Sequence, residues 1–90
     1  MLNPDLTPQA DAGLDRRGWP LRGIAAQAIE ALCASDGTAP DSDPVPLVAP
    51  NRQIFLRHPQ KPRERVRIVF CVYLDRGILH VSIVERAPLF

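Results

Sequence analysis

Apolar and polar residues alternate along two runs of the chain, residues 65–74 (RVRIVFCVYL) and residues 78–86 (ILHVSIVER). A period of two residues is typical of half-buried β-strands, and the short DRG turn between the runs predicts an antiparallel hairpin over residues 66–86. Residues 53–57 (QIFLR) have the same character, and Pro59 and Pro62 prevent this strand from continuing. The pattern therefore predicts a three-stranded antiparallel sheet.

The turn and the apolar pattern of the hairpin favour different registers. The DRG turn suits a three-residue loop with Gly77 in the left-handed conformation, which would set Leu74 opposite Ile78. A two- or four-residue loop sets Leu74 opposite Leu79. We prefer this second register because it gathers the apolar residues of both strands on one face. That face would carry Val66, Ile68, Phe70, Val72, Leu74, Leu79, Val81 and Ile83.

Residues 19–35 (WPLRGIAAQAIEALCAS) have the helical period, with an apolar stripe on one side. Pro20 suits the first helical position, and the SDG segment at residues 35–37 predicts a glycine C-cap. We therefore expect an α+β fold in which one main N-terminal helix packs on the three-stranded antiparallel sheet, in the order helix-strand-strand-strand. The stripe consists of Leu21, Ile24, Ala25, Ala28, Ile29 and Leu32.

Two segments lack a sustained period. We expect residues 1–17 to form a flexible arm. Within it, Thr7 and Pro8 could begin a single helical turn that Gly13 would end. Residues 36–51 contain four prolines between acidic and small residues, so neither helix nor strand is expected there. We thus predict one small α+β domain over residues 18–90, with a proline-rich loop at residues 36–51.

In the preferred register the second face of the hairpin is half apolar. It would carry Arg67, Val69, Cys71 and Tyr73 beside His80, Ser82, Val84 and Arg86. Because one helix covers only one face of a small sheet, this face should meet the arm, the proline-rich loop, a second copy or another molecule. The two large C-terminal residues could pack under the helix or contact the partner. The predicted partner-binding residues are Val69, Tyr73, His80, Val84, Leu89 and Phe90.

Charge is divided unevenly along the chain, although the formal net charge is only +1. Residues 1–50 hold seven acidic and three basic residues, whereas residues 51–90 hold eight basic and three acidic residues. The basic stretch from residue 52 to 67 predicts either a solvated surface or a site that grips a phosphate backbone. The nucleic-acid-binding residues of this alternative are Arg52, Arg57, Lys61, Arg63, Arg65 and Arg67.

Signals for catalysis are weak. Tyr73, His80, Ser82, Arg67 and Arg86 could together serve a metal-independent ribonuclease, with His or Tyr moving a proton and the arginines stabilising phosphorane charge. The chain contains no nucleophile-elbow, zincin, P-loop or dinucleotide motif. Its two cysteines and two histidines lack the spacing of metal ligands, so we expect no metal and no cofactor, and we interpret both cysteines as small buried hydrophobes.

The leading hypothesis is a small non-enzymatic binding protein of the bacterial accessory type. It would act by occupying a surface on a protein partner, as an inhibitor, accessory or regulatory factor, or would form a homodimer through the hairpin. The alternative is nucleic-acid binding through residues 52–67, with ribonuclease activity as its sharper form. No secretory signal is visible and the longest apolar run, residues 68–74, is too short to span a bilayer, so we expect a cytoplasmic protein without membrane contact.

Overall fold

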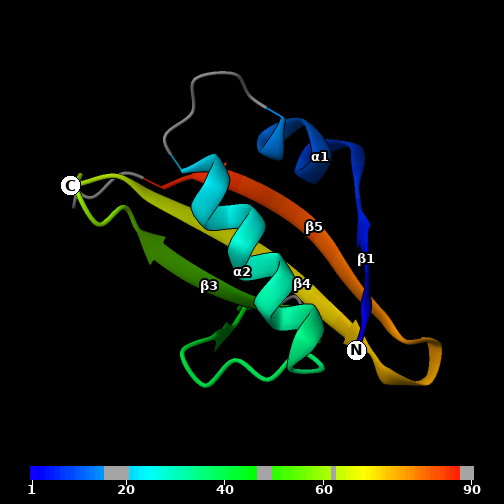
Figure 1. Ribbon diagram of the computed structural model, residues 1–90. Coiled ribbons are helices and arrows are strands. Elements are labelled where there is room, and N and C mark those ends of the chain that lie inside the picture. The colour runs from blue at the N-terminus through cyan, green and yellow to red at the C-terminus, as the bar shows by residue number, and fades with distance from the viewer. Residues whose placement is uncertain (16–20, 47–49, 62, 88–90) are drawn as a thin grey trace.

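The computed structural model describes residues 1–15, 21–46, 50–61 and 63–87. These residues form a five-stranded mixed sheet with two helices on one of its faces (Figure 1). The strand order is β1-β5-β4-β3-β2; β1 is parallel to β5 and all other neighbours are antiparallel. The elements are β1 (Asn3–Leu6), α1 (Pro8–Leu14), α2 (Arg22–Ala34), β2 (Asp43–Pro44), β3 (Arg52–Arg57), β4 (Arg65–Tyr73) and β5 (Ile78–Arg86).

The predicted α+β class is confirmed, and the three predicted strands are β3, β4 and β5. The prediction of only three strands is wrong, because β1 and β2 extend the sheet at its two edges. Neither added strand shows an apolar alternation: β1 contains Pro4 and has an almost wholly exposed burial pattern, and β2 is two residues long. Both join the sheet through backbone hydrogen bonds, which a side-chain pattern does not reveal.

The core lies between the helices and the helix-facing side of β3, β4 and β5. The predicted apolar stripe of α2 faces this core, since Ala25, Ile29 and Leu32 are buried. The helix ends in a Schellman motif in which the Gly37 N–H donates to the Leu32 carbonyl at 2.7 Å, while Asp36 takes the left-handed conformation with φ of 55°. The predicted C-cap therefore forms, and its first left-handed residue is Asp36, one position before Gly37.

The N-terminal segment, predicted as a flexible arm, contains β1 and α1. Thr7 caps α1 as its spacing suggests, since its Oγ1 accepts from the Ala10 N–H at 3.2 Å. Gly13 does not end the helix. It lies inside α1 at the point where the helix crosses β5, and a Cβ there would collide with the Val84 carbonyl oxygen. The absence of a side chain thus allows α1 to approach the strand.

The β4–β5 hairpin differs from the preferred register. Tyr73 pairs with Ile78, so four residues form the loop, and Gly77 takes the left-handed conformation with φ of 65°. Phe70 pairs with Val81, whereas Val69 pairs with Ile83, so the strand ladder contains a β-bulge. Ser82 is the extra residue. From Val69 and Ile83 onward, away from the turn, the residues pair as they would have done with a three-residue loop.

The bulge changes which side chains enter the core. Val66, Ile68, Phe70, Val72, Leu79 and Val81 face the helices as predicted. The prediction is wrong for Leu74, which is 68% exposed in the turn, and for Ile83, which the bulge moves to the other face. Val84 takes the place of Ile83 and is only 3% exposed.

The packing of α1 predicts opposite effects for the same substitution in the two helices. Gly13→Ala should lower the free energy of unfolding by about 1–3 kcal/mol, because the new Cβ meets backbone that cannot move aside. Gly23→Ala in α2 has open space around it and should raise that free energy by up to about 1 kcal/mol. Urea unfolding followed by circular dichroism measures both. Equal effects would mean that α1 does not pack on β5.

The bulge predicts that two neighbouring residues tolerate a hydroxyl differently. Val84→Thr keeps the side-chain shape but buries a hydroxyl in the core, so it should cost about 1–3 kcal/mol of unfolding free energy. At position 83 the hydroxyl cost is the difference between Ile83→Thr and Ile83→Val, which removes the effect of the lost methyl group. It should be smaller, because that half-buried side chain lies outside the core, where the hydroxyl can reach water. A larger hydroxyl cost at position 83 in urea unfolding would contradict the observed register.

Candidate functional site

One face of the sheet carries no described helix, and we call it the helix-free face. Both helices pack on the opposite face, and the two segments that were expected to offer cover lie at the edges of the sheet as β1 and β2 (Figure 1). The strand pairing and the alternation of side chains define the residues of this face. They include Asp5, Gln53, Phe55, Arg67, Val69, Cys71, Tyr73, His80, Ile83 and Glu85.

At the centre of the helix-free face, a charged side chain forms hydrogen bonds with both neighbouring strands. Arg67 on β4 bonds to Glu85 Oε1 through NH1 at 2.9 Å and to Gln53 Oε1 through Nε at 2.9 Å. Val69 and Cys71 follow on the same strand and are only 3% and 4% exposed. The charge of Arg67 at the centre of this face is neutralised by Glu85.

Two aromatic side chains lie toward opposite ends of the helix-free face. Phe55 is 38% exposed, and the guanidinium of Arg65 lies 4.7 Å from its ring centroid. Tyr73 is 39% exposed and has the guanidinium of Arg76 at 5.7 Å. A hydrogen bond with the Cys71 side chain raises the pKa of the Tyr73 phenol, whereas Arg76 lowers it. Aromatic and arginine side chains of this kind are enriched in protein interfaces.

A row of three residues crosses the neighbouring strands of this face. Asp5 on β1 pairs with His80 on β5, and His80 pairs with Cys71 on β4. The Asp5 carboxylate lies 3.0 Å from His80 Nδ1, which is how a carboxylate orients a catalytic histidine. Cys71, however, is buried and forms no side-chain hydrogen bond with His80 in the described structure, and neither of the two main pockets touches the row. The Asp5–His80 contact therefore serves to hold β1 against β5.

The predicted partner-binding residues are only partly brought together. Val69, Tyr73 and His80 share the helix-free face. Val84 lies in the core on the other side of the sheet because of the bulge. Leu89 and Phe90 lie outside the described residues.

The residues considered for ribonuclease chemistry do not form one cluster. Arg86 pairs with Val66 and so belongs to the helix-facing side, where it bonds to Glu64 at 3.1 Å. The Ser82 hydroxyl lies in the bulge and donates to the Val69 carbonyl at 3.3 Å. Arg67 is paired with Glu85. The groups that would move protons and stabilise charge are therefore separated or already engaged.

The predicted nucleic-acid-binding residues divide among three places. Arg52 is tied to the segment before β2, with Nε bonding to Ser42 Oγ at 2.7 Å and NH2 to the Ser42 carbonyl at 2.6 Å. Arg67 lies in the centre of the sheet. Arg57 and Arg65 are cross-strand partners at the far end of β3, and the exposed Lys61 and Arg63 lie in the turn that joins them. Only this last group is a concentrated basic surface, which we call the basic end.

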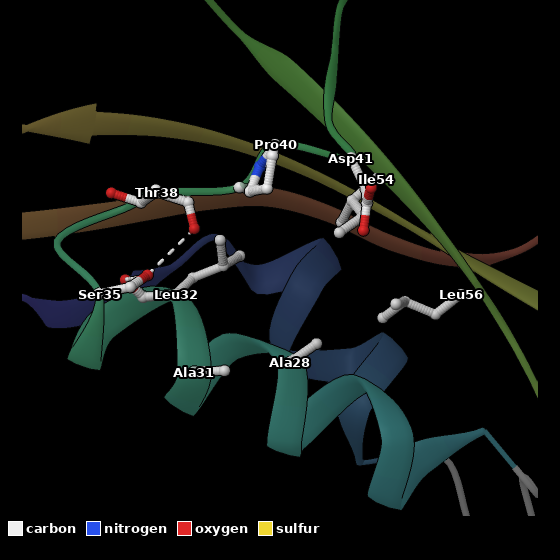
Figure 2. A pocket seen from close by; sticks show the side chains of 10 residues that line it. Ala28, Ala31, Leu32, Ser35, Thr38, Pro40, Asp41, Ile54 and Leu56 are labelled. Carbon is white, nitrogen blue, oxygen red and sulfur yellow. Dashed lines mark hydrogen bonds between the residues drawn. The ribbon is translucent and has the colours of Figure 1, made fainter.

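The sequence did not reveal a groove between α2 and β3. It has a volume of about 360 Å³, and Figure 2 shows the short side chains of α2 facing those of β3 across it. Small alanines on this side of the helix leave the space open. The sequence shows these alanines but not which strand lies opposite them. The groove is lined by Ala28, Ala31, Leu32, Ser35, Thr38, Ala39, Pro40, Asp41, Ile54 and Leu56.

A second pocket of about 480 Å³ lies between the N-terminal segment and the end of α2. Cys33 lines it, and burial raises the pKa of this thiol, so the thiolate form is disfavoured. Within the described ranges, no three His, Cys, Asp or Glu side chains lie close enough together to hold a metal ion. No helix in the described part of the chain is long and apolar enough to cross a membrane.

Comparison of the chain with models of known protein families, with curated protein sequences and with solved structures finds no significant match.

Proposed function

We propose that this protein is a small non-enzymatic binding module that acts by occupying a surface on a protein partner, as an inhibitor, accessory or regulatory factor. The observation that carries this proposal is the helix-free face. The two segments that were available to cover it extend the sheet sideways instead. Among the described residues, the face therefore remains uncovered by a helix, with half-exposed aromatic side chains on either side of the neutralised Arg67–Glu85 pair.

The electrostatics of this face support a protein partner. A phosphate backbone is bound by cationic side chains whose charge is available to it. At the centre of the helix-free face, the arginine is instead neutralised by Glu85, and His80 lies against Asp5. The two further arginines of this face, Arg57 and Arg65, lie at its basic end. Paired charges around aromatic side chains are suited to complementary charges and apolar groups on another protein, where such pairs contribute mainly to specificity.

A second candidate function, nucleic-acid binding, is favoured by the basic end alone. Arg57 and Arg65 stand directly opposite each other on antiparallel strands, an arrangement that like charges destabilise. Glu64 in the same turn is already bonded to Arg86. A bound phosphate would relieve the repulsion at this end of the sheet.

The protein-binding proposal predicts that adding charge at one aromatic anchor abolishes partner binding. Tyr73→Asp should reduce the amount of each specifically captured protein about fivefold or more, because aromatic residues that anchor an interface contribute more than about 1 kcal/mol. The experiment is affinity capture from the native host with quantitative mass spectrometry. Leu74→Asp is the matched control, since this adjacent residue is exposed in the turn and carries the same charge change. Capture that Tyr73→Asp leaves unchanged would refute the proposal.

The alternative predicts a salt-sensitive gel shift with duplex or single-stranded nucleic acid at low salt. Replacing Arg57, Lys61 and Arg63 together by alanine should weaken the shift and reduce the slope of log affinity against log salt by roughly three. Replacing Arg22 and Arg76, which lie elsewhere on the surface, should have a much smaller effect. The absence of any shift with the wild-type chain would end this alternative.

A further inference from the structure

The outer edge of β3 is open over most of its length. β3 pairs with β4 along all six of its residues, but on its other side β2 pairs only with Arg52 and Gln53. In the described part of the chain, no strand continues this pairing along residues 54–57. Pro59 then ends the strand. An open edge of this kind is a template for another strand.

The phase of the hydrogen bonds shows which backbone groups point outward. The Asn51 carbonyl accepts from the Val45 N–H at 3.0 Å on the β2 side, and the His58 N–H donates to the Glu64 carbonyl at 3.1 Å on the β4 side. Because this direction alternates along an antiparallel strand, the N–H and C=O groups of Phe55 and Arg57 point toward the open edge. Two donors and two acceptors are thus available there.

The groove between α2 and β3 lies on the helix side of the same edge (Figure 2). Ile54 and Leu56 line it and are only half-buried, because the alanine side of α2 leaves them partly uncovered. A strand added to β3 would place its own inward side chains beside these two. The edge therefore offers both backbone hydrogen bonds and an apolar surface to a neighbouring strand.

Exposed charge of opposite sign lies at the two ends of this edge. The acidic end is formed by Asp41, which lines the groove, and Asp43, which pairs with Gln53. The basic end, with Arg57, Lys61 and Arg63, lies at the other end of β3. An antiparallel copy of this edge would lay each acidic end along the opposite basic end, whereas a parallel copy would bring like charges together.

We propose that the open edge of β3 binds a second copy of this chain, with the two β3 strands antiparallel about a two-fold axis near Leu56. In this arrangement Phe55 of each copy lies opposite Arg57 of the other, and their outward backbone groups form the hydrogen bonds. The contact is isologous, so each favourable charge contact occurs twice. The result is one continuous sheet with all helices on one side and a helix-free face that spans both copies.

This contact differs from a dimer built through the hairpin, because β4 and β5 are both interior strands of the sheet. It is also separable from the proposed function, since the contact uses the β3 edge and leaves Tyr73, toward the other end of the helix-free face, outside it. Tyr73→Asp should therefore leave dimerisation unchanged, and failure of one proposal does not entail failure of the other.

Charge reversal tests the contact. One variant carries Asp41→Lys and Asp43→Lys, and the other carries Lys61→Glu and Arg63→Glu. Sedimentation equilibrium of the wild-type chain should show a dimer of twice the 10.0-kDa chain mass, and each variant alone should dimerise about tenfold more weakly or worse. An equimolar mixture of the two variants should form a heterodimer, because each then presents the charge that the other needs.

A backbone variant provides a second test. Phe55→Pro removes one outward N–H from an edge position that tolerates proline, so it should abolish the dimer while circular dichroism remains unchanged. Hydrogen exchange of the Phe55 and Arg57 amides should slow with increasing concentration of the wild-type chain. A wild-type chain that stays at 10.0 kDa at the highest concentration reached would overturn the proposal and leave the edge for an extended segment of another protein. A dimer that the charge variants leave unaffected would overturn it too.

Discussion

The pairing of β4 with β5 is the interaction on which the rest of the structure depends, because these two strands supply most of the buried sheet residues. Next to the left-handed Gly77, Tyr73 pairs with Ile78, and farther along the register shifts by one residue so that Val69 pairs with Ile83. The extra residue, Ser82, accommodates this shift. Its carbonyl accepts a hydrogen bond from Thr7 Oγ1 at 2.6 Å, so the bulge also secures the start of α1.

The position of the N-terminal segment decides which surfaces remain open. β1 occupies the outer side of β5 and α1 packs beside α2, so this segment enlarges both the sheet and the helical layer. The proline-rich loop contributes only the short β2. One face of the sheet and much of the β3 edge therefore lack cover from any described element. The face is the surface proposed to bind another protein, and the β3 edge is the surface proposed to bind a second copy.

The distribution of charge has a similar consequence. The sequence divides its charge unevenly, with acidic residues in excess up to residue 50 and basic residues in excess after it. In the folded chain, part of that charge is neutralised in pairs such as Arg67–Glu85 and Arg86–Glu64. The charged side chains that remain exposed include acidic residues at one end of β3 and basic residues at the other. Complementarity between two antiparallel copies follows from this separation and not from the net charge.

The sequence by itself determined the fold class, the long helix with its buried stripe, the three central strands and the N-cap at Thr7. Each of these depends on local periodicity or local backbone chemistry. Tertiary structure alone decided the edge strand β1, which pairs by backbone, and the bulge, which shifts the β4–β5 register by one residue. It also decided the place of Val84 and the groove beside the alanines of α2. Such features depend on which segments of the chain become neighbours in space, and a local sequence pattern does not contain that information.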